Sequence, residues 1–442
     1  MILLGEGTVF TRDTKNPMIT RGAVVMDGSK IVEVGAYDVL KEKYPDAEYI
    51  DAKGKVIMPA FINAHHHIYS GLARGLSIPG NNPTNFTEIL EGLWFFLDRN
   101  LDKDSVWASA VATYMACIEN GVTTIFDHHA SYGETTNSLS VIADVAKLFG
   151  VRSCLCYEVS DRNGQAAMEE AVAENVRFGK EAAKDPAHLA AMFGLHASFT
   201  LSDDTLAYVL KENVDKLGYH IHVAEGMADV EDSISQYGVR PIERLYWKGI
   251  LGPKTIAGHC IHIDQNEVER LQETRTMVVH NPESNMGNAV GAPDILTMLN
   301  YNICVGLGTD GYTSDMLESY KAANCLVKHR AGLPNVGWGE VPMMLFENNR
   351  RMANAFFAEE TGILKTGAAA DVIVVDYVPP THMDESNLNG HLLFGVNGMH
   401  VTTTISDGQI RMLNRELVGL NKDELLGEVR NVANALWKRL HV

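Results

Sequence analysis

The stretch VIMPAFINAHHH, residues 56–67, decides how this sequence is to be interpreted. It begins as a nearly continuous apolar run over 56–65 and ends in three consecutive histidines. Such a short apolar run is typical of a strand buried on both faces of a parallel sheet. Histidine binds metals and transfers protons near neutral pH, so the stretch joins a buried strand to chemically active side chains.

Seven further runs of the same character follow, separated by amphipathic helical stretches. They lie at 123–129, 152–158, 190–197, 219–225, 255–260, 276–282 and 303–310. Apolar strands that alternate with helices over about 250 residues predict an α/β protein built on one closed (β/α)₈ barrel. A doubly wound open sheet would also alternate. Its first strand is usually followed by a glycine-rich turn, whereas residues 61–67 are rich in histidine.

Polar side chains cluster at the ends of these runs. They are His65, His67, His129, Glu158, His196, His222, His259, His280 and Asp310. In a barrel the carboxyl ends of all the strands meet on one face, where the catalytic groups of barrel enzymes lie. The pattern therefore predicts an active site at that face.

The two ends of the chain have a different texture. Residues 1–55 show short strands and turns, including a hairpin signal in which Asp27-Gly28 separates 23–26 from 30–34. Short strand patterns return at 364–377 and 401–412, and 422–440 has helical spacing. We expect 1–55 and 360–442 to form a small β-sandwich domain plus a C-terminal helix, and 56–359 to form the barrel.

Composition limits the partners and the compartment. The chain has 56 Asp and Glu against 37 Lys and Arg, a formal charge of −19, which argues against nucleic acid or an anionic membrane as partner. Its 6 Cys form no C-x-x-C pair, and no signal peptide or long apolar span is visible. We expect a cytoplasmic enzyme that acts on a small molecule and forms a homodimer.

The histidines of the first strand form the beginning of a metal site. Residues i and i+2 of a strand share a face, so His65 and His67 can reach one ion while His66 points away. An isolated H-x-H is weak evidence, but later strand ends add His222, His259 and Asp310. Imidazole and carboxylate ligands suit Zn²⁺ or Fe²⁺, and three His with one Asp leave a coordination position open.

The chain resembles the amidohydrolase superfamily, in the branch of aminohydrolases and chlorohydrolases that includes cytosine, guanine and adenosine-type deaminases. The resemblance covers nearly the whole chain. It is carried by PAFINAHHH at 59–67, HIHVAEG at 220–226, AGHC at 257–260, HNPESNM at 280–286, GLGTDG at 306–311 and ADVIVVD at 370–376.

The resemblance implies a role for each matching residue. It makes His65, His67, His222 and Asp310 the ligands of a divalent metal. It makes Glu225 the proton shuttle, His259 the group that orients or polarises the attacking water and the oxyanion, and His196 a substrate contact. Two-metal members bridge their ions with a modified lysine. The third and fourth runs contain no Lys, so one metal per chain is expected, Zn²⁺ in first place.

The implied reaction is hydrolysis of a C–N bond in a purine- or pyrimidine-like heterocycle by a metal-activated hydroxide, with Asp310 taking a proton from the water. Deamination is favoured over two alternatives, opening of a cyclic amide ring and a triazine-type chlorohydrolase reaction. A non-catalytic metal-binding scaffold is disfavoured because neither a ligand nor Glu225 is missing.

Further residues are candidates for substrate binding. Arg74, His129, Glu158 and Asn285 follow predicted strands, each with a structural alternative such as a surface cation, a structural hydrogen bond or a turn. The long segment Ser70–Asn100 contains Trp94-Phe95-Phe96 and is expected to form a lid or a wall of the substrate pocket. The alternative is that these aromatic residues only cover the barrel rim.

Overall fold

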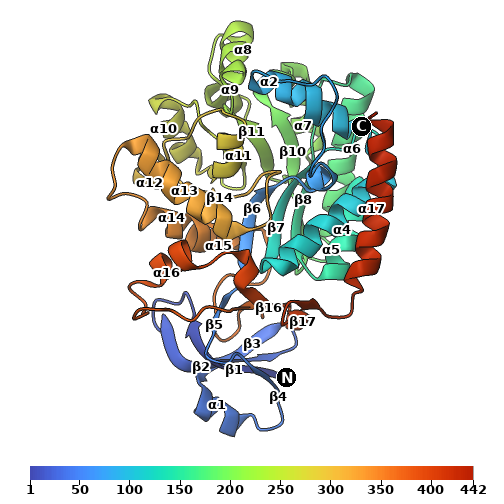
Figure 1. Ribbon diagram of the computed structural model, residues 1–442. Helices are drawn as coiled ribbons and strands as arrows, with labels where there is room; N and C mark the ends of the chain where they lie inside the picture. Colours follow the sequence, from blue (N-terminus) through green and yellow to red (C-terminus); the bar gives the residue numbers. More distant parts are fainter. Residues whose placement is uncertain (442) are drawn as a thin grey trace.

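Parallel strands from the middle of the chain close into a barrel in the computed structural model, which describes residues 1–441 (Figure 1). One set pairs in the order β6-β7-β8-β9 and the other in the order β10-β11-β12-β13-β14. Bridges from His66 to Asp310 and from Val159 to Leu195 join the two sets. The strands are β6 (Phe61–His66), β7 (Val122–His129), β8 (Arg152–Tyr157), β9 (Leu189–Ala191), β10 (Phe193–Ala197), β11 (Tyr219–Val223), β12 (Ile256–His259), β13 (Met277–His280) and β14 (Val305–Leu307). The predicted (β/α)₈ barrel is confirmed.

Two of the predicted strands are divided. The run 56–65 forms β5 (Val56–Pro59), which pairs with strands of a second sheet, and then β6 of the barrel. The run 190–197 divides at Met192, because β9 pairs with β8 while β10 pairs with β11. In each run the strands before and after the division are largely buried, so the apolar sequence pattern does not show where the run divides.

Helices surround the barrel (Figure 1). They are α4 (Lys103–Glu119), α5 (Ser138–Phe149), α6 (Gln165–Ala182), α7 (Asp203–Glu212), α8 (Met227–Tyr237), α9 (Pro241–Trp247), α10 (Gln265–Thr274), α11 (Pro282–Gly287), α12 (Ile295–Asn300), α13 (Met316–Ala331), α14 (Glu340–Pro342), α15 (Asn349–Phe356) and α16 (Leu388–Gly395). Local sequence sets their ends. A capping box between Asp264 and Glu267 starts α10, and Gly332, in a left-handed conformation, ends α13.

Strands from both ends of the chain form a nine-stranded sheet within residues 1–441, below the barrel in Figure 1. Besides β5, they are β1 (Ile2–Phe10), β2 (Met18–Asp27), β3 (Lys30–Ala36), β4 (Glu48–Asp51), β15 (Val372–Val375), β16 (Val401–Ser406), β17 (Gln409–Leu413) and β18 (Glu416–Leu417). The predicted hairpin is present, with Asp27 paired to Lys30 and Gly28 at a φ of 54°. Helix α1 (Tyr37–Lys43) packs Tyr37 and Leu40 against this sheet. The predicted fold class is confirmed, while the exact domain boundaries stay a prediction.

The predicted C-terminal helix is α17 (Lys422–Arg439), and it lies along α4 on the side of the barrel (Figure 1). Leu436 is fully buried in this contact, and Trp437 Nε1 donates a hydrogen bond to the carbonyl oxygen of Leu72 at 3.0 Å. The helix therefore packs on the barrel instead of on the small sheet. Within the described residues, none of the helices combines the length and apolar character needed to cross a bilayer.

A buried ion cluster joins the barrel to the sheet. Arg152, at the start of β8, bonds through Nη1 to Asp371, the residue before β15, and both side chains are 1% exposed. Its Nη2 donates to Asp407 Oδ1, which follows β16, at 3.1 Å. The guanidinium group thus connects the amino-terminal end of the barrel to two strands of the other sheet.

Candidate active site

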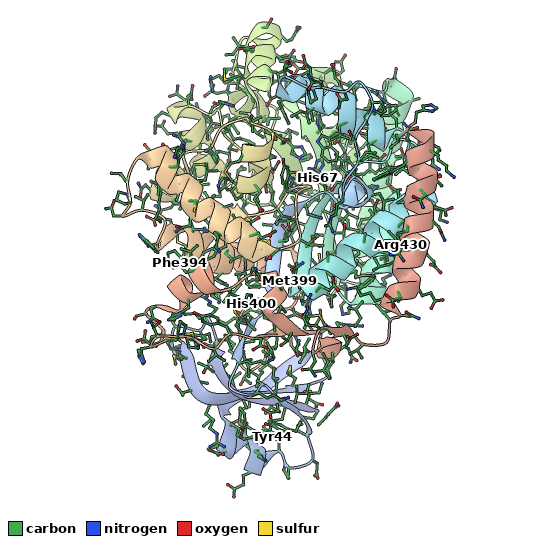
Figure 2. All side chains as sticks on the ribbon, viewed as in Figure 1. Tyr44, His67, Phe394, Met399, His400 and Arg430 are labelled. Carbon is green, nitrogen blue, oxygen red and sulfur yellow. The ribbon has the colours of Figure 1, made fainter. Side chains whose placement is uncertain are left out.

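Four imidazole rings and one carboxylate converge where the barrel strands end. His65 lies on β6 and His222 on β11, while His67, His259 and Asp310 stand at or just after the ends of β6, β12 and β14. Figure 2 shows His67 in the middle of the barrel domain. His67 Nε2 lies 3.1 Å from His222 Nε2 and 3.0 Å from Asp310 Oδ1, and His259 Nε2 lies 3.5 Å from Asp310 Oδ2.

The backbone is shaped to bring the carboxylate against the first strand. Gly308 has no room for a side chain, because a Cβ atom there would lie 2.9 Å from His65 Cβ. That close approach lets the Asp310 N–H donate to the carbonyl oxygen of His65 at 3.1 Å. Asp310 and His259 have φ values of 53° and 68°, a left-handed conformation that costs about 1–3 kcal/mol per residue and is common at functional sites.

The hydrogen bonds of the imidazole rings fit a metal ion. His67 Nδ1–H donates to the carbonyl oxygen of His128 at 2.6 Å, and His222 Nδ1–H donates to that of His196 at 2.9 Å. In the neutral form of each ring Nε2 is therefore the unprotonated atom, and a cation bound there would take the place of the second proton that Asp310 favours on His67 against the effect of burial. His65 Nε2 is also buried with no hydrogen-bond partner among residues 1–441. Its candidate ligand atom, like those of His67 and His222, lies within 4.8 Å of the other two. Nitrogen lone pairs that face one another in this way can share a cation.

Glu225 and Asp310 lie on either side of His259, and their surroundings shift the two pKa values in opposite directions. Burial raises the pKa of Glu225 to about 7, against the opposing effect of His259, whose Nε2 lies 3.5 Å from Glu225 Oε2. Burial also acts to raise the pKa of Asp310, but His67 holds it well below its usual range. Asp310 is thus ionised in the resting site and free to accept a proton, whereas Glu225 changes protonation near neutral pH, as a general acid–base group should.

A cavity opens over these residues, and the segment between the first strand and its helix forms one wall of it. The helical pieces α2 (Phe86–Ile89), η2 (Leu90–Trp94) and α3 (Phe95–Asp98) follow each other without a break, and η2 is a π-helical turn. From this segment the lining residues are Ser70, Phe86, Leu90, Trp94, Phe95 and Asp98. The expectation of a pocket wall in Ser70–Asn100 agrees with this placement.

Two of the expected substrate contacts lie at the cavity and one beside it. Glu158 and His196 line it together with Glu225. Arg74 is exposed and lines a neighbouring cavity of about 450 Å³, which it shares with His66. His66 thus points away from the metal ligands, as strand alternation predicts.

The other two expected contacts do not line the cavity. His129 is fully buried behind it, with Nε2 2.8 Å from Ser131 Oγ, because the alternation of β7 turns His128 inward instead. Asn285 is buried as well, and its Oδ1 accepts from His259 Nδ1 at 2.8 Å. Asn285 thus holds the His259 ring and does not line the cavity, and its contact with substrate stays a prediction.

Four residues at or beneath the cavity were missed in the sequence. His220 Nε2 lies 2.8 Å from His65 Nδ1, and strand alternation could have found it, because it precedes His222 by two positions. His128 supplies the carbonyl for His67. Asn288 follows Ser284 by one helical turn and donates to Glu225 Oε1 at 3.4 Å. Asp98 could have been noticed as the acidic residue that ends the run LWFFLD.

Known proteins resemble this chain over nearly its whole length. The model of the amidohydrolase family matches residues 56–411, and that of a bacterial imidazolonepropionase-like composite domain matches 22–47. The chain is 30% identical to a 5'-deoxyadenosine deaminase of Methanobrevibacter smithii, with 98% of each chain covered. It is 29% identical to a 5-methylthioadenosine/S-adenosylhomocysteine deaminase of Pelotomaculum thermopropionicum, with 99% of each covered. Its fold matches the crystal structure of an adenosine deaminase from Xanthomonas campestris with bound zinc at a TM-score of 0.87 and 22% identity, covering 99% of this chain and 98% of that one.

Proposed function

This chain belongs to the amidohydrolase family, and from that membership we propose that it is a metal-dependent aminohydrolase that removes the exocyclic amine of a purine-type ring. The observation that carries the proposal is the convergence of imidazole nitrogens and the Asp310 carboxylate on a cavity that also holds Glu225. In the net reaction water supplies an oxygen to the ring carbon and ammonia leaves. Adenine nucleosides are the first substrates to test, because their deaminases are similar over nearly the whole chain.

We propose that His65, His67, His222 and Asp310 hold one divalent cation, Zn²⁺ in first place and Fe²⁺ as the alternative. The donor set supports this, because imidazole and carboxylate suit both metals. A bound cation of this kind supplies Lewis acidity that makes water a nucleophile at neutral pH.

Asp310 and Glu225 carry out different proton transfers in the proposed reaction. Asp310, ionised and able only to accept, takes a proton from the attacking water. Glu225 takes up a proton near neutral pH and delivers it to the amine nitrogen that leaves. His259, held by Asn285, orients the water and faces the oxygen on which negative charge develops.

Substrate recognition falls to the remaining cavity walls. We propose that Glu158 and His196 contact the ring or its substituent, and that Arg74 meets a substituent that extends into the neighbouring cavity. The runs NAHHHIYSGLARG, FDHHAS, SDRNG and HNPESNMGN resemble the aminohydrolase called SsnA, and we propose that the chain groups with it. We also expect a homodimer.

A substrate screen with metal analysis on the same preparation tests the function. Adenosine, 5'-deoxyadenosine, guanine and a chlorinated triazine are each incubated with the protein, and ammonia, chloride and product mass are measured. Ammonia release with replacement of the amine by oxygen is the expected result. Gain of one water without ammonia would indicate ring opening, and chloride release would indicate a chlorohydrolase.

A further inference from the structure

One arginine connects the cavity wall formed by residues 70–100, called the lid below, to the barrel beside the cavity. Arg162 lies in the loop between β8 and α6, and its side chain is 8% exposed. Its Nη1 donates to Asp98 Oδ1, on α3 of the lid, at 3.3 Å, and its Nη2 donates to Glu158 Oε1, after β8, at 2.8 Å. The guanidinium group also lies between two rings, 4.1 Å from the centre of Phe95 and 4.6 Å from that of Tyr132.

These contacts leave one acceptor without a protein partner. Asp98 and Glu158 are 1% and 3% exposed, and both line the cavity, whereas among residues 1–441 they share the single guanidinium group of Arg162 as ion-pair partner. Glu158 Oε2 has no hydrogen-bond partner among residues 1–441. Glu158 lines the cavity, and an ionised carboxylate oxygen only accepts, so this oxygen is open to a donor that arrives with the ligand.

The charge state of Glu158 supports this interpretation. Burial acts to raise its pKa, but His196 and Arg162 lower it to about 2, so the group is an anion under ordinary conditions. For Asp98 burial prevails over Arg162 and raises the pKa to about 7. Glu158 is therefore an ionised hydrogen-bond acceptor at neutral pH, whereas Asp98 is only partly ionised.

We propose that Glu158 is the specificity-determining acceptor on the β8 side of the cavity, and that Arg162 is a positioning residue that aims Glu158 while it fastens the lid through Asp98 and Phe95. The inference rests on the proposed function and adds a substrate class. The preferred purine carries hydrogen-bond donors on the edge that faces β8, either a second ring amine or the hydroxyls of a sugar.

Two probe pairs distinguish these sources of donors. Adenosine is compared with its dideoxy analogue, which lacks both ribose hydroxyls, and diaminopurine with adenine, which lacks the second amine. All four carry the amine that is removed, so kcat/KM can be measured for each on the metal-loaded enzyme. A hydrogen bond to a charged group predicts a preference of about 10-fold or more for the donor-bearing member of one pair.

Variants of Glu158 and Arg162 test whether Arg162 orients Glu158 toward the substrate or only stabilises the fold. Glu158→Gln should reduce that preference to within about threefold, because the donor-bearing member loses more kcat/KM than the member without the donors. Arg162→Met should do the same and also speed hydrogen exchange of the backbone amides over 86–98. Arg162→Lys should restore part of the preference, because a single ammonium group keeps the charge but not the fork that holds two carboxylates.

Arg99→Met is the matched control. Arg99 also connects the end of the lid to this loop, because its Nε donates to Asn163 Oδ1 at 2.7 Å, but this acceptor is an amide oxygen and not a carboxylate. It should keep the preference between probes. Circular dichroism and metal content check that every variant is folded, and Asp98→Asn provides a second test of the lid contact should Arg162→Met not fold.

The outcomes are distinct. If Arg162→Met slowed both members of the pair equally, Arg162 would only support the fold and the proposal would be overturned. If the wild type deaminated all four purines with no preference in either pair, the inference would fail while the function stood. If none of the four were bound or deaminated, both would fail.

Discussion

At the residue scale, the ability of a histidine to bind a metal through Nε2 depends on the hydrogen bond that its Nδ1 makes. The carbonyls of His128 and His196 can only accept, so they fix the protons of His67 and His222 on the far side of each ring. In each ring the inward Nε2 is thereby the atom whose lone pair can bind a cation.

Metal content tests this ligand set. The wild type should hold about one divalent ion per chain, as expected for three imidazoles and one carboxylate. His222→Ala removes a ligand at the centre of the group and should empty the site, with activity lost. Elemental analysis of both proteins provides the measurement, and Arg99→Met serves as a control that should retain the ion. Two tightly held ions in the wild type would contradict the prediction.

Glu225→Gln separates the proton shuttle from the ligands. Glutamine keeps the size and the bond from Asn288 but cannot carry the proton, so the variant should fold, keep its metal and still bind substrate. Its kcat should fall by at least about 10²-fold, the scale for loss of a general acid–base group. Steady-state kinetics on ammonia release measures this fall. Loss of metal would instead make Glu225 a ligand.

The sequence predicted which of these residues lie close together, but it did not predict the orientation of every side chain. Alternation along a strand separates His65 and His67 from His66, since that rule depends on backbone geometry alone. It cannot orient Asn285, which lies in the short helix α11 after β13, where the side chain follows the local turn. The bond from Asn285 to His259 therefore could not be predicted from its position after the strand.

At the element scale, apolar runs predicted the strands but not the sheet to which each belongs. Residues 56–65 read as one strand, yet the Ala60 N–H bonds to Asp371 and the Phe61 N–H bonds to Gly121, so the chain changes sheets between them. Pairing partners are remote in sequence, and burial is complete on both sides. The pattern of a single run contains no record of that change.

The C-terminal helix gives a prediction at this scale. Leu436→Ala removes a fully buried side chain from the contact of α17 with α4 and should lower the free energy of unfolding by about 2–5 kcal/mol. Leu425→Ala, at a half-buried position of the same helix, should cost less. Urea unfolding compares the two. The metal content should not change, and an equal effect of both variants would show that the contact is not centred on Leu436.

At the scale of the whole molecule, the barrel and the nine-stranded sheet share one buried charge cluster. Arg152 starts a strand of the barrel, and its partners Asp371 and Asp407 stand at the ends of strands from the other sheet. Burying charges is costly unless they are paired with good geometry, so loss of either member leaves the other exposed to that cost. The cluster thus makes the two parts of the molecule depend on each other.

The last prediction concerns the pH dependence of that junction. Burial acts to raise the pKa of Asp371, but Arg152 outweighs it and holds the pKa below its usual value. A carboxyl whose pKa is lower in the folded protein stabilises it above the unfolded pKa of about 3.9, and this contribution disappears as the pH falls through the folded pKa. Asp371→Asn should therefore cost about 3 kcal/mol near neutral pH and progressively less below about pH 4. Urea unfolding of the metal-free protein at several pH values measures the difference, since protonation of ligand histidines would otherwise release the ion.

Asp407→Asn, which removes a more exposed partner of the same arginine, should cost less at neutral pH. A difference between wild type and Asp371→Asn that stayed constant from pH 7 to pH 2 would show that the Asp371 charge does not stabilise the junction.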